Sequence, residues 1–477
     1  MFNKANTNEQ KPAVDRISLK ALIYALVSLF ITISVVTLLF FSPSFLTQEE
    51  SNISALLLIV IALWATGIIP EHITALLFFF TTVIFSLAPV EIVFAGFTSA
   101  AFWLVFSGLV IGVAINETGL GKRFAEQIVK HLEGSYIKII TGMVLIGVIF
   151  SFLMPSAMGR IVLLIPIAMG IADHFAFSSG SNGRTAIILA AIFGTFIPAF
   201  SILPANVANM ILAGLAENQF NISFLYGQYL LLHFPILGML KAIIIIALLI
   251  WLYPDSPSEK QYRELSASRK ITKQESVLLK LIVLLLILWG SDFIHHISPA
   301  WIALGGAIFL LLPGFNIVSP KAFNDKINLS PLLFVAGILG FGGVISSSGI
   351  GDILAQTFLS ILPMKQGETF INFMLLNIMA TMTTFMTTLP GVPAVLTPIS
   401  SQLSQATGLP LESVMMTQVI GFSTVIFPYQ APPILVGLQM AGENIPGAIK
   451  FCLWLTLVSL IFLAPLNFFW WHLMDMF

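Results

Sequence analysis

Hydrophobic segments of about twenty residues recur along the chain, and they limit its fold more than any other feature. Residues 21–41 and 230–252 are two such segments. As an α-helix, a segment of this length spans the hydrocarbon core of a bilayer. Lys, Arg, Asp and Glu account for 9% of the 477 residues, against roughly 25% in soluble domains. The sequence therefore predicts an all-α polytopic membrane protein with on the order of 10 to 12 spans, some of them broken.

Charge, cysteine content and motifs exclude several other classes. The net charge is -1 at pH 7, so no excess of basic side chains can neutralise nucleic-acid phosphates. The single cysteine, Cys452, excludes an intramolecular disulfide and any multi-cysteine metal site. No G-x-x-x-x-G-K-[ST] motif for ATP occurs. We therefore expect the lipid bilayer and a small solute as partners, no nucleic acid, and no direct use of ATP as an energy source.

Basic residues define the predicted topology. Residues 1–20 carry Lys and Arg directly before the first hydrophobic segment, which places the N-terminus in the cytoplasm. Residues 253–275 form a long polar stretch inside the chain, and their basic residues predict a cytoplasmic linker. This linker separates a first membrane half, residues 21–252, from a second half, residues 276–477. We expect a multi-pass protein of the inner or plasma membrane.

The two halves contain matching breaks in their hydrophobic segments. One match, at an offset of 232 residues, aligns L-M-P-S-A-M-G-R-I-V-L-L-I-P-I from Leu153 with F-M-T-T-L-P-G-V-P-A-V-L-T-P-I from Phe385. Another, at 230 residues, aligns I-N-E-T-G-L-G from Ile115 with I-S-S-S-G-I-G from Ile345. Two collinear matches indicate a duplication. Because Gly and Pro interrupt helical hydrogen bonds, each break predicts a cavity or packed protein around it.

The charges that follow these matches predict how the repeats are oriented. Four basic residues lie within residues 121–138, whereas only Lys365 lies in the equivalent stretch of the second half. The positive-inside rule places the two stretches on opposite faces, so the repeat is predicted to be inverted. Inverted repeats with broken helices are the architecture of secondary transporters, whose substrates bind near the midplane. We expect re-entrant hairpins at about residues 94–118 and 330–348.

Five further motifs carry a family resemblance. The first half contains W-A-T-G-I-I-P-E-H-I-T-A-L-L from Trp64, F-A-G-F-T-S-A-A-F-W-L-V-F-S-G from Phe94 and E-T-G-L-G-K-R from Glu117. The second half contains L-W-G-S-D-F-I-H-H from Leu288 and P-L-L-F-V-A-G from Pro331. Together they resemble the divalent anion:sodium symporter family over nearly the whole chain. The resemblance implies secondary active transport of a di- or tricarboxylate or of sulfate, commonly with sodium, by an elevator-type homodimer.

That family carries S-N-T at its two hairpin tips, which hold sodium and the substrate carboxylates. Counting back from the shared prolines places the tips at residues 156–158 and 388–390, which read S-A-M and T-L-P. The family's T-P-P segments correspond to L-P-A-N at residues 203–206 and A-P-P-I at residues 431–434. The candidate substrate ligands implied are Ser156, Ala157, Asn206, Thr387, Thr388, Gln430 and Ala431. The candidate ion ligands implied are Ser156, Gly194 and Thr388.

The tips depart from the family in the groups that bind sodium. Ala157, Met158, Leu389 and Pro390 offer no side-chain oxygen, whereas sodium prefers a cage of several oxygens. Sodium is the candidate coupling ion, and we expect transport to depend on it weakly or not at all. No other cofactor and no metal site is expected.

Arg160 follows the first tip within a hydrophobic stretch, where a charge costs at least about 2.5 to 3.5 kcal/mol. One hypothesis is that its guanidinium binds a substrate carboxylate and supplies positive charge in place of sodium. The alternatives are snorkelling to the interface or a structural pair with Asp173.

The other polar candidates have structural alternatives as well. The hydroxyl residues at the tips could cap helices, and Asn206 and Gln430 could bond the freed backbone of their own broken helices. Glu71 and His72 could form a proton relay, although their place at a helix end favours an interfacial position.

The sequence as a whole predicts a secondary transporter of an anion, most simply a carboxylate. A rival within transport is a sodium/proton antiporter or an arsenite-type permease on a similar fold. A rival from another class is an intramembrane enzyme. The enzyme is disfavoured because no G-x-S-x-G, H-E-x-x-H or clustered Asp pair lies in any predicted span.

Overall fold

A computed structural model describes residues 32–38, 43, 46–129, 135–256, 270–315, 317–443 and 445–477. Every regular element within these ranges is a helix, which confirms the predicted all-α class. The predicted cytoplasmic N-terminus, and residues 257–269 of the predicted linker, lie outside the described residues. The chain forms two units, Met1–Ile59 and Val60–Phe477. In the first unit, the Ser51 hydroxyl donates a hydrogen bond to the Leu38 carbonyl (2.6 Å).

The helices follow a similar order in both halves of the chain. The first half runs through α2 (Gln48–Thr66), α3 (Glu71–Ile84), α4 (Val90–Val93), α5 (Ala95–Thr98), α6 (Ala100–Thr118), α7 (Leu120–Val129), α8 (Tyr136–Leu153), α9 (Ala157–His174), α10 (Asn182–Phe196), the 3-10 turns η1 (Pro198–Ser201) and η2 (Leu203–Ala205), α11 (Val207–Phe220), α12 (Tyr226–His233), the π-helical η3 (Phe234–Leu240) and α13 (Lys241–Leu252).

The second half runs through α14 (Lys273–Gly290), α15 (Asp292–His295), α16 (Pro299–Leu311), α17 (Pro320–Lys326), α18 (Ser330–Ser347), α19 (Ile350–Ile361), α20 (Thr369–Met386), α21 (Gly391–Leu396), α22 (Ser400–Thr407), α23 (Leu411–Phe422), the 3-10 turn η4 (Pro428–Gln430), α24 (Pro432–Ala441), α25 (Ile445–Val458), the π-helical η5 (Ser459–Leu463) and α26 (Ala464–Leu473). A π-helical segment therefore interrupts the last long helix of each half.

Within the described residues, eight helices are long and apolar enough to cross a membrane, and six more apolar helices are shorter. The sequence predicted more spans because it counted some of the shorter segments. The predicted re-entrant hairpins at residues 94–118 and 330–348 are wrong, because α6 and α18 are each one continuous helix. Glycines of α18 let neighbouring segments approach closely instead of breaking the helix, as a Cβ on Gly340 would lie 2.1 Å from the Val93 carbonyl oxygen.

The matching breaks in the sequence form two helical hairpins. α8 joins α9 through residues 154–156, and α20 joins α21 through residues 387–390. Each tip contains a proline, Pro155 or Pro390, which lacks an N–H donor and restricts the residue before it, so neither incoming helix can continue through its tip. The tips therefore lie at or beside the positions predicted from the sequence.

A broken helix follows each hairpin. α10 continues through η1 and η2 into α11, and α23 continues through η4 into α24. Prolines at the start of η1, η4 and α24 remove backbone donors, which prevents one regular helix across either break. The predicted combination of hairpins and broken helices is thus confirmed, with one of each per half.

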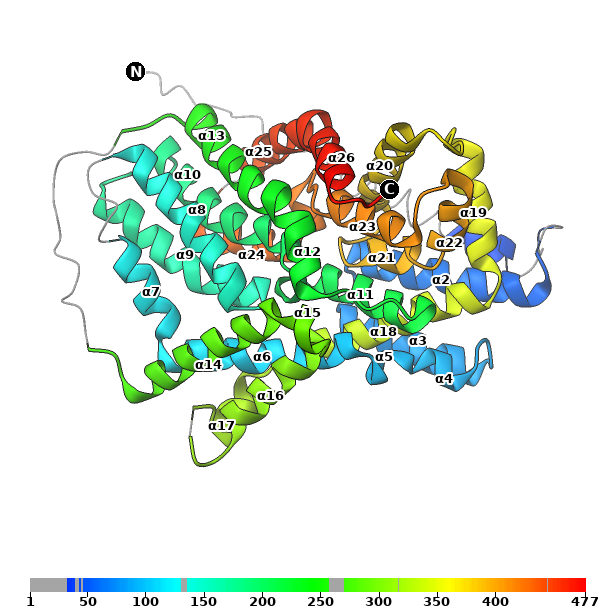
Figure 1. The fold of residues 1–477 in the computed structure, drawn as a ribbon, viewed down its shortest axis with the longest axis horizontal. Coiled ribbons are helices and arrows are strands. Elements are labelled where there is room, and N and C mark those ends of the chain that lie inside the picture. The colour runs from blue at the N-terminus through cyan, green and yellow to red at the C-terminus, as the bar shows by residue number, and fades with distance from the viewer. Residues whose placement is uncertain are drawn as a thin grey trace, which may run out of the picture. The chain divides into compact units, whose positions relative to one another are not determined.

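Corresponding helices of the two halves exchange packing partners (Figure 1). α6 packs against α16, and α18 packs against α3; likewise α9 packs against α24, and α11 against α21. Such an exchange is what an approximate two-fold relation between repeats produces. Gly119 and Gly349 support the same relation, since they are 230 residues apart and both are left-handed, with φ of 74° and 78°. The predicted duplication is therefore visible in the packing.

Candidate functional site

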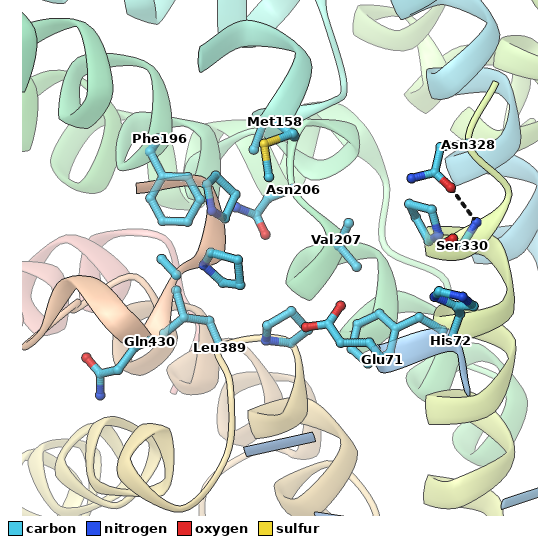
Figure 2. A pocket seen from close by; sticks show the side chains of 17 residues that line it. Glu71, His72, Met158, Phe196, Asn206, Val207, Asn328, Ser330, Leu389 and Gln430 are labelled. Atoms are coloured by element: carbon cyan, nitrogen blue, oxygen red, sulfur yellow. Dashed lines mark hydrogen bonds between the residues drawn. The ribbon is translucent and has the colours of Figure 1, made fainter. Parts of the chain in front are cut away.

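The first turns of five helices surround one cavity of about 270 Å³ within the larger unit (Figure 2). These helices are α3, α9, α11, α18 and α24, and each presents its N-terminal end. The lining residues are Glu71, His72, Ala157, Met158, Phe196, Asn206, Val207, Asn328, Ser330, Pro331, Phe334, Leu389, Pro390, Gln430, Ala431, Pro432 and Pro433. The cavity therefore joins both hairpin tips and both broken helices.

Backbone N–H groups are among the hydrogen-bond donors at this cavity. Ala157 and Met158 occupy the first two positions of α9, and Val207 occupies the first position of α11. The first N–H groups of a helix have no intrahelical acceptor, and the described residues supply no other acceptor for these three. Each helix N-terminus also carries about half a positive elementary charge. Several N-termini around one cavity are suited to binding an anion.

Ser156 and Asn206 set where these two helices begin. The Ser156 hydroxyl accepts a hydrogen bond from the Gly159 N–H (3.1 Å), so Ser156 is the N-cap of α9. The Asn206 side-chain oxygen accepts from the Ala208 N–H (3.0 Å) and caps α11, while the residue also lines the cavity. The capping alternative is therefore realised for Ser156, and Asn206 combines a cap with a place in the cavity wall.

Gln430 lines the cavity from the second broken helix, and Ala431 lies beside it. Its side-chain oxygen accepts hydrogen bonds from the Ile426 and Phe427 N–H groups (2.9 Å each). Its amide nitrogen donates to the Thr384 hydroxyl (2.7 Å). The Gln430 amide is thus engaged in bonding freed backbone, which is the structural alternative considered for this residue.

The hydroxyl residues of the second tip are not part of the cavity lining. Leu389 and Pro390 line the cavity, whereas Thr387 and Thr388 do not. The Thr388 hydroxyl oxygen is buried and has no hydrogen-bond partner among the described residues. The Thr387 hydroxyl lies against Gly391, where an added Cβ would approach it to 1.9 Å. Substrate or ion binding by either hydroxyl stays a prediction.

Gly194, the remaining candidate ion ligand, lies in the contact between α8 and α10. A Cβ on Gly194 would lie 2.7 Å from the Val144 Cα, and a Cβ on Gly147 would lie 2.5 Å from the Gly194 carbonyl carbon. The second half repeats this contact between α20 and α23, where a Cβ on Gly421 would lie 2.2 Å from the Ala380 Cβ. The structure gives Gly194 a packing role and leaves its role as an ion ligand untested.

Arg160 is fully buried and does not line the cavity. Its guanidinium donates to the Thr195 hydroxyl (3.0 Å) and carbonyl (3.3 Å), the Ala205 carbonyl (3.1 Å) and the Met154 carbonyl. Full burial excludes snorkelling to the interface in this conformation. The alternative of a structural pair with Asp173 is not realised either, because that carboxylate pairs with Arg184. The hypothesis of direct substrate binding by Arg160 is not supported by this geometry.

Sequence reasoning missed the wall formed by α3 and α18. Glu71 and His72 begin α3, and Figure 2 shows the Glu71 carboxylate directed into the cavity. Ser330 and Phe334 line it from α18, where the Ser330 N–H donates to the Asn328 side-chain oxygen (3.0 Å). The sequence contains P-E-H-I-T at the start of α3 and P-L-L-F at the start of α18. Their contact could not be predicted from these motifs, because the two segments are about 260 residues apart and are brought together only by the tertiary structure.

A helical membrane protein with a hairpin and a broken helix in each half, and a cavity between them, is a secondary transporter by architecture. This chain belongs to the citrate transporter family, whose profile matches residues 61–421. Family membership confirms the predicted class of anion carrier and favours a transporter over the intramembrane enzyme considered above.

Similar proteins extend this comparison. An L-tartrate/succinate antiporter of Escherichia coli (strain UTI89 / UPEC) is 25% identical over 364 residues, which cover 71% of this chain and 72% of that protein. An uncharacterized transporter of Haemophilus influenzae is 23% identical over 435 residues, covering 87% and 91%. The crystal structure of the Alcanivorax borkumensis YdaH transporter superposes with a TM-score of 0.54 at 16% identity, covering 84% of this chain and 90% of that one. The last comparison supports the fold alone.

Proposed function

We propose that this protein carries a small di- or tricarboxylate across the inner or plasma membrane, with the substrate bound in the cavity where the five helix N-termini converge. That convergence is the observation that carries the proposal, because no Lys or Arg among the described residues lines the cavity and the lining includes an acidic residue, Glu71. Positive potential therefore comes from helix ends and, at α9 and α11, from N–H groups that have no acceptor within the described residues. The names of the family and of the tartrate/succinate relatives point to the same substrate class.

The apolar lining favours a carbon-containing anion over sulfate. Pro390, Pro432 and Pro433 present aliphatic rings to the cavity, and Phe196 and Phe334 present aromatic ones. A short-chain carboxylate places its charged ends at N–H donors and its carbon atoms against such surfaces, which is the usual pattern in small-molecule sites. Sulfate has no apolar part to contact these walls.

Transport by an elevator-type motion fits the position of the cavity. One wall comes from the hairpins and broken helices, and the opposite wall comes from α3 and α18, which pack against each other. A movement of one wall against the other would carry the cavity between the two membrane faces. The homodimer and the cytoplasmic N-terminus implied by the sequence belong to the same proposal, and the mass of the purified protein in detergent tests the dimer.

The experiment uses proteoliposomes and labelled succinate, tartrate, citrate and sulfate. We expect uptake of one or more carboxylates and little uptake of sulfate. Preloading the vesicles with unlabelled carboxylate should accelerate uptake if the protein is an exchanger, as the relative's name suggests. Failure of every carboxylate to be taken up by folded protein would contradict the proposal.

Ala157→Pro tests the role of the backbone donors. Proline is tolerated at the first position of a helix, and Ser156 has the extended conformation that precedes proline (φ -93°, ψ 110°). The substitution therefore removes one N–H group and keeps α9. We expect carboxylate affinity to fall by about tenfold, since a hydrogen bond to a charged group contributes roughly 1.5 kcal/mol. Lys273→Pro, at the first position of α14 and outside the cavity, is the control and should bind normally.

A further inference from the structure

Two fully buried cationic side chains, Arg160 and Lys241, have no carboxylate partner within the described residues. Arg160 lies in the first turn of α9, and Lys241 begins α13. An unpaired charge inside a membrane protein is costly and is retained where it has a function. What these two cations contact is therefore informative.

Arg160 bonds to carbonyl groups at helix ends. Met154 follows the last residue of α8, Thr195 is the penultimate residue of α10, and Ala205 ends η2. The last carbonyls of a helix have no intrahelical donor and carry about half a negative elementary charge together. The guanidinium thus lies in a cage of carbonyl oxygens at the break of the first repeat.

Lys241 makes the corresponding contact in the second repeat. Its ammonium group donates to the Ser423 carbonyl (2.9 Å) and hydroxyl (3.3 Å), and Ser423 is the C-cap of α23. α23 is the counterpart of α10, since each is the helix that leads into the break of its half. The residue 232 positions after Arg160 is the uncharged Val392, so the cation in the second half comes from another helix.

Freed carbonyls and half-helix C-termini are where secondary transporters bind their coupling cations. We propose that Arg160 and Lys241 are tethered cations that fill these carbonyl positions in both repeats, so that no mobile sodium ion is needed at either break. Arg160 holds the hairpin and the broken helix of the first half together, as a bound ion would, and Lys241 ties α13 to the end of α23 at the second break. The interpretation of Arg160 and Lys241 as substitutes for coupling ions rests on the proposed transport function. Their contacts with the carbonyl groups are independent of that function.

The first arm of the test measures the unmodified protein without substrate. Melting temperature is recorded in sodium chloride and in N-methylglucamine chloride of equal ionic strength, and carboxylate uptake is recorded in the same two salts. We expect both quantities to be unchanged by the exchange of cation. A saturable rise of melting temperature with sodium, or a steep sodium requirement for uptake, would overturn the proposal.

The second arm removes each tethered cation. Arg160→Ala and Lys241→Met should melt at lower temperature in N-methylglucamine, and millimolar guanidinium or sodium should restore much of the loss for Arg160→Ala by occupying the vacated carbonyls. Methylammonium or sodium should likewise restore much of the lost melting temperature of Lys241→Met. Lys280→Met removes an exposed lysine of α14 and is the control, with no cation response expected.

The outcomes separate this inference from the proposed function. Folded variants whose melting temperatures ignore every added cation would overturn it, and if the variants do not fold, the sodium response of the unmodified protein decides. A protein that transports no carboxylate but shows the expected cation responses would contradict the proposed function and leave the tethered cations standing.

Discussion

Polar side chains near this cavity bond backbone groups, and main-chain groups are left available to a substrate. The polar side chains that the sequence singled out, Ser156, Asn206, Gln430 and Arg160, all bond backbone groups of their own breaks. The groups left to meet a substrate therefore include main-chain N–H groups, which any residue other than proline supplies, beside polar side chains such as Asn328 and Ser330. This explains how the tips can lose the family's Asn and Thr side chains and still form a cavity suited to an anion.

Glu71 is the charged side chain that should oppose the substrate. Neutralising it by Glu71→Gln should strengthen dicarboxylate binding about tenfold, since at least roughly 1.4 kcal/mol of like-charge repulsion is removed at short range. Titration calorimetry of purified protein with succinate measures the change. Glu91→Gln, an exposed acidic residue in the first turn of α4, is the matched control and should leave the affinity unchanged.

A weaker affinity for dicarboxylate in Glu71→Gln would contradict the expected repulsion between Glu71 and the substrate. It would mean that the carboxylate helps to hold the substrate, for instance through a proton shared with it, and the helix ends alone would not account for binding.

At the scale of helices, close glycine contacts fix how each hairpin lies on its broken helix. Gly194→Ala should push α8 and α10 apart, because the new Cβ would meet the Val144 backbone at 2.7 Å. We expect a loss of about 1 to 3 kcal/mol of stability, typical of overpacking, measured as a lower melting temperature. Gly170→Ala in α9 is the control, because no described atom beyond its own helix backbone and chain neighbours lies within 4 Å of the added Cβ. It should be neutral or slightly stabilising because Ala favours helix more than Gly does.

Equal destabilisation by the two substitutions would show that the helix contact does not depend on Gly194. The loss would then reflect backbone conformation at glycine in general.

Prolines made the positions of the hairpin tips predictable from the sequence. Glycines led to the wrong prediction of re-entrant hairpins. Pro155 and Pro390 remove donors wherever they stand, so the hairpin tips follow from local chemistry. Glycine has no such fixed effect, because it either ends a helix or lets another helix approach. Gly340 within α18 belongs to the second kind, and only its contact with Val93 reveals this. Local patterns therefore predicted the broken elements but placed two hairpins where continuous helices lie.

At the scale of the whole molecule, the exchange of partners between repeats decides where the cavity forms. α9 of the first half packs on α24 of the second, and α11 packs on α21, so both breaks are brought to one place. No sequence pattern within one half specifies these contacts. The sequence therefore favoured an interfacial position for Glu71. In the structure, the packing of α3 against α18 places this residue in the cavity wall.

The inverted orientation of the two repeats gives a direct test at this scale. Lys122 and Asp352 are exposed, lie 230 residues apart and follow the matched left-handed glycines. In a Cys452→Ala background, Lys122→Cys and Asp352→Cys should react with a membrane-impermeant maleimide from opposite sides, the first from the cytoplasmic side because basic residues surround it. Right-side-out and inside-out vesicles distinguish the two faces, and the parent Cys452→Ala protein controls for background labelling. If both cysteines reacted from the same face, the repeats would be parallel, and a two-fold axis in the membrane plane could not relate the two breaks.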